Sequence, residues 1–389
     1  MPMTLIEFYD KSPLENIVSS LAIRPEKTVF LGSNIKLMAR EMKRYQDLLK
    51  DKDIIVDMEY RYIEKNDLNQ IQDTLSRVAE ENPCCAVDLT GGDGLTLVAV
   101  GTVAHTLKDK NISFHRVNLN TRKMVDFFGT EPEHDVYDPI LSVAENIALY
   151  GGSVVYGNDR FSGTYRWDWN DDFKNDINGM WEIVRQDCRA WNTQMKQIEG
   201  SVKFDILKAA RIGAKPWNKK LFYQLSEIGV ISNLSFDGEK ISFDIKNKQI
   251  ATVLSKVGTI LELKTYLLAS GEPHFTDVMT GVCIDWDGKT NGIIGTENEI
   301  DVLCMKGLTL VFISCKNGSV DGAELYKLHT VAQRFGGHYA KKALVATHID
   351  KCQRGMEYFR QRARDMNIQL IENVYEFDDK EFARRLKGI

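Results

Sequence analysis

Short apolar runs alternate with amphipathic segments over roughly the first 130 residues, and this alternation constrains the fold most strongly. The segment from Asn34 to Lys50 places Ile35, Met38, Met42, Tyr45 and Leu49 at helical spacing. Repeated strand–helix–strand units with apolar strands are typical of a parallel sheet covered on both faces. We therefore predict an N-terminal α/β domain with a Rossmann-like parallel sheet. Strands are expected at 4–9, 28–32, 53–63, 84–90 and 112–119, with helices at 14–22, 34–50, 67–81 and 94–108.

The chain has 389 residues, too many for one ordinary core, so two domains and a small third module are expected. No run of about 18 apolar residues predicts a membrane span. The seven cysteines contain no C-x-x-C pair, and no basic-then-apolar leader is seen, which together favour a cytoplasmic protein with reduced thiols. Because the net charge is −5, any nucleic-acid surface must be local.

The pattern weakens between about residue 130 and residue 250. We expect a loop over 129–139, helix over 176–213 and 221–231, and a hairpin over 236–245 that turns at Asp237-Gly238. We interpret residues 146–250 as a connecting module between an N-terminal domain over 1–145 and a C-terminal domain over 251–389.

The last 140 residues follow a different order, with a helix, three successive strands, a second helix and a further strand. The short turn Lys306-Gly307-Leu308 separates the second and third of these strands, so a hairpin places Asp301 opposite the segment Ser314–Lys316. The helices are expected at 256–270, 323–335 and 355–366, and the strands at 276–287, 298–305, 308–316, 342–348 and 368–372.

This order brings two carboxylates and a lysine within reach of one another. Glu262 and Asp301 are candidate ligands for Mn²⁺ or Mg²⁺, which prefer carboxylate, carbonyl and water oxygens, and the carbonyl of Cys315 is a candidate third ligand. Lys316 is placed to orient a water or to neutralise developing negative charge. Such a centre suits phosphodiester hydrolysis. Taken singly, each residue is more often structural, and only the combined order favours catalysis.

Three further side chains are candidate contacts for nucleic acid. Gln333 faces the site if helix 323–335 packs as expected, and Lys341 and Lys342 can hold phosphates. An exposed helix position is an equal alternative for Gln333. For the run Arg360–Arg364, a solvated helix face is preferred.

Polar, small-residue loops follow three strands of the N-terminal domain. One loop, 88–94, contains Thr90, Gly91, Gly92 and Asp93, and the others contribute Asp10 and Ser12, and Gly32, Ser33 and Asn34. Loops after the carboxyl ends of parallel strands line the ligand crevice of a doubly wound sheet, and helix-start N–H groups favour phosphate. We therefore predict a site for a phosphate-bearing ligand. Ordinary helix capping is an equal alternative for Ser33 and Asn34.

The C-terminal region resembles the PD-(D/E)XK restriction-endonuclease-like superfamily, and within it the nuclease domain of the CRISPR-associated CARF nucleases. The stretches that carry the resemblance are GTILELKTY, TNGIIGTENEIDVL and LVFISCKNG. By position, Glu262 matches the helix glutamate, Asp301 the metal-binding aspartate and Lys316 the motif lysine. Ser314 stands where the general pattern has Asp or Glu, and Glu299 compensates only if it shares a face with Asp301.

The N-terminal region resembles a CARF domain, the sensor of CRISPR-linked cyclic oligoadenylates, through its strand order, its D-x-T-G-G loop and its G-S-N turn. The resemblance implies a homodimer that binds a ring-shaped activator across its two-fold axis. Ligand binding would then favour an arrangement in which the nuclease sites accept substrate.

Together the two resemblances imply a cyclic-oligoadenylate-activated, metal-dependent endonuclease that acts on DNA, RNA or both, with cyclic tetra-adenylate as the expected ring. The first alternative is a sensor that regulates transcription without cutting. It would use residues 202–245 as a helix–helix–hairpin module whose cations are Lys208, Arg211, Lys215, Lys219 and Lys220. The second alternative is a nuclease fold that has lost catalysis.

Overall fold

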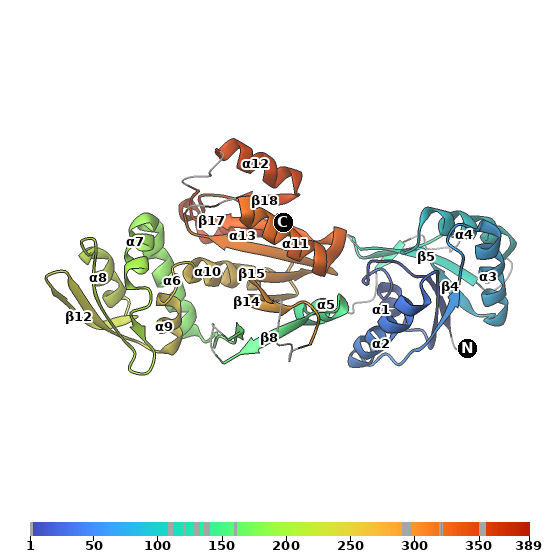
Figure 1. Cartoon of the computed structure of the whole chain (residues 1–389), viewed down its shortest axis with the longest axis horizontal. Helices are drawn as coiled ribbons and strands as arrows, with labels where there is room; N and C mark the ends of the chain where they lie inside the picture. The colour runs from blue at the N-terminus through green and yellow to red at the C-terminus, as the bar shows by residue number, and fades with distance from the viewer. Residues whose placement is uncertain are drawn as a thin grey trace. The chain divides into compact units, whose positions relative to one another are not determined.

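A computed structural model describes residues 3–107, 112–119, 121–127, 133–135, 141–158, 162–289, 297–318, 320, 322–349 and 355–389 (Figure 1). The chain divides into two compact units. One comprises Met1–Leu141 with Ala148–Gly151, and the other comprises Ser142–Ile147 with Gly152–Ile389. Among the described residues, no helix is both long and apolar enough to cross a membrane. The predicted α/β class is confirmed.

The N-terminal unit is built on a sheet with the strand order β3-β2-β1-β4-β5-β6-β7. The strands from β3 to β5 run parallel, β6 pairs antiparallel with β5, and β7 pairs antiparallel with β6. Every residue of β1 is buried, as expected of a strand covered on both faces. The strands are β1 (Thr4–Phe8), β2 (Lys27–Gly32), β3 (Asp57–Tyr62), β4 (Cys85–Asp88), β5 (Ile112–Asn118), β6 (Lys123–Asp126) and β7 (Glu133–Asp135), and the helices are α1 (Val18–Ile23), α2 (Ile35–Asp51), α3 (Leu68–Glu81) and α4 (Gly94–Leu107).

The expected loop over 129–139 is partly wrong, because β7 lies inside it. β6 was likewise not predicted. Both strands are only three or four residues long, so neither repeats an apolar alternation often enough to be recognised. They form by pairing with neighbouring strands at the edge of the sheet, and the apolar pattern of the local sequence does not predict such pairing.

The C-terminal unit contains a sheet with the order β18-β17-β16-β15-β14-β8-β9. The predicted three-strand meander forms β14 (Asp277–Asp285), β15 (Glu297–Lys306) and β16 (Thr309–Lys316). β17 (Lys341–Ala346) pairs parallel with β16, and β18 (Ile368–Ile371) pairs parallel with β17. Two short strands that the sequence does not predict, β8 (Ser153–Gly157) and β9 (Thr164–Tyr165), extend the sheet beyond β14. The helices of this part are α5 (Val143–Leu149), α10 (Thr259–Ser270), α11 (Gly322–Gly336), α12 (Met356–Asp365) and α13 (Asp379–Lys387).

A smaller sheet in the same unit has the order β10-β11-β13-β12. The prediction of continuous helix over 176–213 is wrong beyond Ile198, because Gly200 takes a left-handed φ of +77° and the chain continues as strands. The hairpin at Asp237-Gly238 is confirmed. The elements are α6 (Asp171–Gln186), α7 (Cys188–Ile198), β10 (Val202–Lys203), β11 (Lys208–Ile212), α8 (Lys219–Glu227), β12 (Ile231–Asp237), β13 (Lys240–Ile245) and α9 (Lys248–Leu254). The helix–helix–hairpin of the regulator alternative is therefore not formed over 202–245.

The segment interpreted as a connecting module shares one hydrophobic core with the nuclease-like part. Trp181 of α6 packs against Phe382 of α13, with ring centroids 6.3 Å apart. The same buried cluster continues through Leu263 of α10 to Ile313 of β16. These contacts fix α10, which carries Glu262, against the sheet that carries Asp301.

A buried lysine ties three helices of this unit together. The ammonium of Lys264, whose side chain is only 2% exposed, donates to Asn178 Oδ1 and to Asp379 Oδ2, both at 2.8 Å. Asp379→Ala is expected to lower the free energy of unfolding by about 3 kcal/mol, because it leaves a buried charge without its counter-ion. Lys264→Met, which removes the charge and keeps the bulk, is expected to cost about 1 kcal/mol. Urea denaturation of both variants checks this order, and a larger loss for Lys264→Met would contradict it.

Candidate active site

Glu262 lies in the first turn of α10, a helix whose neighbouring residues Ile260, Leu261 and Leu263 are buried in the core. The side chain is 5% exposed, although it carries a carboxylate. Burial of a carboxylate is costly without a compensating charge or hydrogen bonds. A cation bound beside Glu262 would supply such a charge.

The register of the β15–β16 hairpin positions Asp301. Val302 pairs with Ile313 in this antiparallel hairpin. Asp301, the residue before Val302, therefore lies opposite Ser314, the residue after Ile313. The Asp301 carboxylate accepts the backbone N–H of Cys315 at 2.6 Å and the Ser314 hydroxyl at 3.1 Å, both on Oδ2. Two donors thus orient this carboxylate, and the predicted hairpin geometry is what brings them to it.

Three carboxylates gather at this place. Glu262, Glu299 and Asp301 each offer an oxygen, and these atoms lie within 4.8 Å of one another. Glu299 and Asp301 are two residues apart on β15 and so share a face. Oxygens that bind one Mg²⁺ at about 2.1 Å lie roughly 3–4 Å apart, so small side-chain rotations suffice to fit a divalent ion. The Glu299 carboxylate also forms an ion pair with Lys256 at 3.6 Å.

Lys316, at the end of β16, lies between two acidic groups. Its Nζ is 3.9 Å from Asp301 Oδ2 and 3.1 Å from Glu324 Oε2. Burial by itself lowers the pKa of this lysine, but the charges of Asp301 and Glu324 outweigh it and raise the pKa above its ordinary value of 10.5. Lys316 is therefore an ammonium ion at neutral pH, suited to stabilising negative charge.

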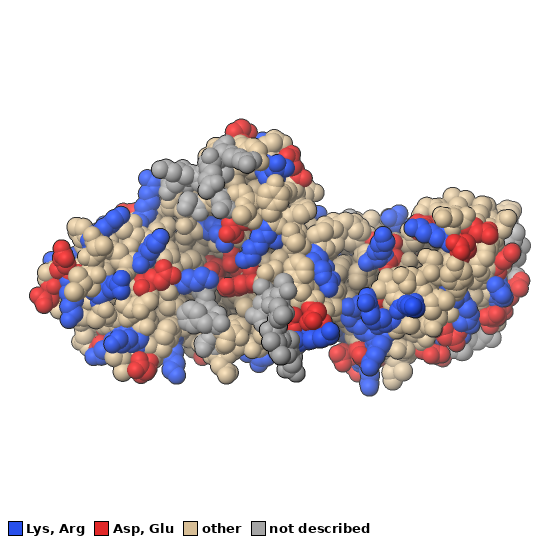
Figure 2. All heavy atoms as spheres, in the orientation of Figure 1, with Lys and Arg blue, Asp and Glu red and all other residues tan. Residues whose placement is uncertain are grey.

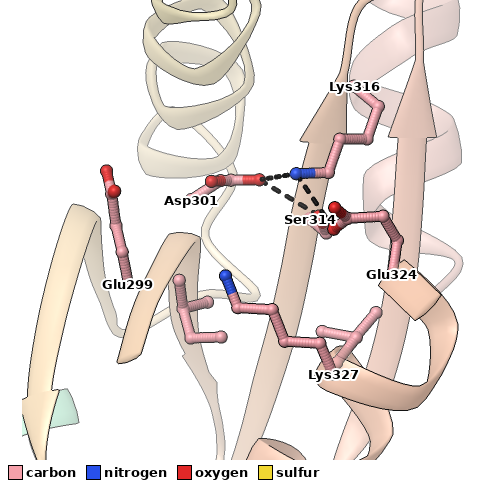
Figure 3. A pocket seen from close by; sticks show the side chains of 8 residues that line it. Glu299, Asp301, Ser314, Lys316, Glu324 and Lys327 are labelled. Carbon is pink, nitrogen blue, oxygen red and sulfur yellow. Dashed lines mark hydrogen bonds and ion pairs between the residues drawn. The ribbon is translucent and has the colours of Figure 1, made fainter. Parts of the chain in front are cut away.

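A small cavity of about 20 Å³ adjoins this cluster, enough for one water molecule or ion (Figure 3). Glu299, Asp301, Ser314 and Lys316 line it from the sheet, and Ile300, Glu324, Lys327 and Leu328 complete it. Figure 2 shows acidic and basic side chains together where α10, β15 and α11 meet. Glu324 and Lys327 were not predicted as site residues, although their spacing on α11 puts both on one helix face soon after β16 ends.

The remaining candidates of this unit lie elsewhere. Gln333 is exposed on α11 and does not line the cavity. β17 pairs parallel with β16, so Lys316 is opposite Ala346 while Lys341 is opposite Val311. Five residues of strand, about 17 Å, therefore separate Lys341 from the carboxylate end of the sheet.

Lys342 and Cys315 have buried structural contacts. Lys342 donates to the backbone oxygen of Met366 at 2.7 Å. The Cys315 thiol contacts Thr265 Oγ1 at 3.6 Å, and burial raises the pKa of the thiol well above its ordinary value. The thiol is thus a poor metal ligand, and only the backbone of Cys315 adjoins Asp301.

In the N-terminal unit, the predicted ligand loops follow β1, β2 and β4. These strands are parallel neighbours, so their loops lie at one edge of the sheet. Asn34 caps α2 by accepting the N–H of Leu37 at 3.1 Å, and Ser33 beside it is exposed. Asp93 caps α4 through the N–H of Thr96 at 3.0 Å. The capping role considered for Asn34 is therefore real.

Backbone geometry accounts for the glycines of these loops. A Cβ on Gly91 would lie 2.9 Å from the carbonyl oxygen of Phe8, and Gly92 has a φ of +92°. A Cβ on Gly32 would lie 2.6 Å from Met38 Sδ. Only glycine lets the loops pack this closely against the end of β1 and the start of α2.

Buried polar groups support the loop over 88–94 from below. Asp88 Oδ1 accepts the Thr90 hydroxyl at 2.6 Å, and Thr90 Oγ1 accepts the N–H of Val117 at 2.8 Å. His115 Nε2 lies 3.5 Å from Asp88 Oδ1. On the β1 side, Asp10 Oδ1 accepts the N–H of Ser12 at 2.8 Å. Hydrogen bonds to the end of β4 and to β5 thus hold the loop over 88–94, and a hydrogen bond within the loop after β1 holds that loop.

Glu7 of β1 is 1% exposed, and burial, together with the nearby charge of Asp88, raises its pKa well above 4.5. A raised carboxyl pKa stabilises the folded state at low pH, and this contribution is lost as the pH rises from the unfolded value through the folded one. Glu7→Gln is therefore expected to have a higher free energy of unfolding than the parent protein at pH 8, and the fall in that free energy from pH 5 to pH 8 should be flatter. Denaturation at both pH values measures this, and a less stable variant at pH 8 would refute it.

Comparisons with known proteins agree with this geometry. Residues 251–383 match the family described as "Card1-like, endonuclease domain". Protein VC1899 from Vibrio cholerae has a similar structure, with a TM-score of 0.77 and 16% identity over 99% of this chain and 97% of that one. Can2 from Sulfobacillus thermosulfidooxidans, solved in complex with cyclic tetra-adenylate, gives a TM-score of 0.70 and 15% identity over 99% of this chain and 96% of that one.

No curated protein matches the sequence significantly. At 15–16% identity, the two structures show a shared fold over nearly the whole length of each chain. The family match identifies the domain that carries Glu262, Asp301 and Lys316. Residues 251–383 therefore match the Card1-like endonuclease domain, and the chain as a whole has the fold shared by VC1899 and Can2.

Proposed function

We propose that this protein is a metal-dependent endonuclease of CRISPR defence that cuts DNA, RNA or both when a cyclic oligoadenylate binds its N-terminal unit. The observation that carries the proposal is the meeting of Glu262, Glu299 and Asp301 beside the ammonium of Lys316. The endonuclease family match covers all four residues.

The residues at the site suit phosphodiester hydrolysis. Glu262, Glu299 and Asp301 would hold Mn²⁺ or Mg²⁺, with the Cys315 carbonyl as a further ligand. When bound, the ion lowers the pKa of a coordinated water and polarises the phosphoryl oxygen. Ser314 keeps its hydroxyl on Asp301 and so acts as an orienting group rather than as a replacement ligand. Lys316 neutralises negative charge that develops at the phosphorus.

The net charge of the site explains why the metal ion would bind before the substrate. Among the described residues, the cluster and its surroundings hold four carboxylates and three ammonium groups, namely Glu262, Glu299, Asp301 and Glu324 with Lys256, Lys316 and Lys327. They leave one net negative charge, which repels a phosphate. A divalent ion reverses that sign and makes the site attractive to the nucleic-acid backbone.

The N-terminal loops are proposed to bind the activator, through Asp10, Ser12, Gly32, Ser33, Asn34, Thr90, Gly91, Gly92 and Asp93. Can2 was solved with cyclic tetra-adenylate, which supports a ring of four for this chain as well. A symmetric ring suits a homodimer in which each copy reads half of the ligand with the same loops. The expected location is the cytoplasm, where such a signal would be made.

Cleavage assays test the proposal directly. Single- and double-stranded DNA and RNA are incubated with the protein, with Mn²⁺ or Mg²⁺, and with each cyclic oligoadenylate in turn. Cutting of at least one substrate is expected only when both the metal and one ring are present. Tight ring binding with no cleavage of any substrate would refute the endonuclease function.

Lys327 is the cation of the cavity that forms no ion pair or hydrogen bond within the described part of the chain. Figure 3 shows it extending from α11 toward the carboxylate side of the cavity. Lys327→Gln is expected to raise KM about tenfold with little change in kcat, because one phosphate contact is lost. Mn²⁺ affinity, measured by calorimetry, should be unchanged or tighter, and Lys327→Arg should retain activity. A weaker Mn²⁺ affinity in Lys327→Gln would contradict a phosphate contact.

A further inference from the structure

A strongly basic segment, residues 206–226, precedes the residues of the carboxylate cluster in the sequence. Between Asp205 and Glu227 there is no acidic residue, although the net charge of the whole chain is −5. The segment covers β11, the following loop and most of α8. Its five cations are Lys208, Arg211, Lys215, Lys219 and Lys220. Figure 2 shows Lys and Arg side chains over the end of the C-terminal unit that carries α8 and β12, with acidic side chains among them.

Most of these cations are available to a ligand. Lys208 pairs with Asp244 at 3.3 Å. Arg211, Lys215 and Lys220 are exposed, and their side chains form no ion pair or hydrogen bond within the portion of the chain that the structure describes. Three unpaired cations near one loop favour a polyanion over a neutral partner.

The loop also borders a cavity of about 260 Å³, here called the loop pocket. Trp217, Phe236, Lys215 and Lys219 line it together with Gly213, Ala214, Pro216, Gly238 and Glu239. The Lys219 ammonium lies 5.4 Å from the centre of the Phe236 ring. The pocket therefore combines aromatic rings with ammonium groups.

Its aromatic wall is held rigidly. Trp217 Nε1 donates to the backbone oxygen of Glu239 at 2.5 Å, and the N–H of Gly213 donates to the same oxygen at 3.0 Å. Phe222 packs edge-on against both Trp217 and Phe236, with centroids 5.7 and 6.3 Å away. A Cβ on Gly213 would lie 2.9 Å from the Trp217 ring, so a larger residue does not fit there. A preformed aromatic surface loses little entropy when a flat ring stacks on it.

We propose that the loop pocket is a second nucleic-acid site, which receives one unpaired base against its aromatic wall while Lys215, Lys219 and Lys220 hold the neighbouring phosphates. Each nucleotide supplies a planar base and one negative charge. The base can stack on the aromatic rings of the pocket, and the phosphate can pair with its ammonium groups. An acidic polypeptide matches the lysines but leaves the aromatic wall unused. The proposal concerns binding and does not depend on cleavage.

Oligonucleotide binding to the full chain tests this site. A labelled single strand of about 20 nucleotides is titrated in EDTA at several salt concentrations, so that no cutting occurs. The variant Lys215→Gln/Lys220→Gln is expected to bind about tenfold more weakly, with a slope of log affinity against log salt that is smaller by about 1.4. Phe236→Leu should weaken binding at least about fivefold without changing that slope, because it removes stacking alone.

The matched control is Lys248→Gln/Lys380→Gln, which removes the same charge from two exposed lysines outside the pocket. It should bind like the parent protein. Equal weakening in both double variants would overturn the proposal, and so would stronger competition by poly-glutamate than by an unlabelled oligonucleotide. A protein that shows the expected binding pattern but cuts nothing would contradict the endonuclease function and leave the loop pocket intact.

Discussion

Asp301→Asn is expected to lower the cleavage rate by at least about 10³-fold while leaving the fold intact. Asn keeps an oxygen that can accept the N–H of Cys315 and the Ser314 hydroxyl, which are 2.6 and 3.1 Å from Asp301 Oδ2. It removes the negative charge shared by the metal cluster and Lys316. Loss of one preorganised electrostatic group typically costs 10²–10³-fold, and loss of metal binding adds to this.

Metal binding gives this prediction a second, independent readout. The parent protein should gain thermal stability on addition of Mn²⁺, because the ion binds the folded cluster and not the unfolded chain. The Asn variant should lose most of that gain. Without metal, the variant should be at least as stable as the parent protein, because it relieves repulsion among carboxylates that lie within 4.8 Å of one another.

Ser314→Ala is the matched control for Asp301→Asn. The serine touches the same carboxylate oxygen, but it is a neutral group that only orients it. A loss of about tenfold or less is expected. If Ser314→Ala and Asp301→Asn were equally inactive, or if the Asn variant kept the full Mn²⁺ stabilisation, Asp301 would not be the metal-binding carboxylate.

The parts of this site that the sequence predicts are those set by local register. A short turn fixes which residues of β15 and β16 face each other, so the approach of Asp301 to Ser314–Lys316 follows from the sequence. Glu299 is included through the two-residue period of the same strand. Glu324 and Lys327 were missed because their position depends on how α11 packs across the sheet, which no local pattern encodes.

The difference between local pattern and tertiary packing also explains which elements of the fold were predicted wrongly. The long apolar strands of both units are predicted correctly, since each repeats its pattern over several residues. β9 and β10 are only two residues long, and β8 pairs with the distant β14, so no local pattern marks them. β11 was assigned to a helix because Lys208–Ile212 lacks a continuous apolar face. Gln333 was expected to face the site if helix 323–335 packed as expected, but α11 leaves it exposed while Leu325, Leu328 and Phe335 are buried.

The second large effect is expected for Lys316→Met, with a fall in kcat of about 10²–10³-fold. The ammonium lies 3.9 Å from Asp301 Oδ2, so its removal takes away the positive charge closest to the proposed metal-binding carboxylate. Mn²⁺ affinity should stay the same or rise, because a repulsive neighbour is lost. A lower kcat with unchanged or higher Mn²⁺ affinity would distinguish the role of Lys316 from that of the carboxylates. Loss of a carboxylate is expected to weaken both catalysis and metal binding.

The pH dependence distinguishes an ammonium from a general base at this position. Asp301 and Glu324 raise the pKa of Lys316 above 10.5 in spite of its burial, so the side chain stays protonated between pH 6 and 9. The rate ratio between parent protein and Lys316→Met should therefore be constant over that range. A ratio that grew with pH would show that the neutral amine acts as a base. Glu324→Gln, which removes the partner at 3.1 Å but leaves Asp301, should cost only about tenfold, since one carboxylate still holds the ammonium at the metal.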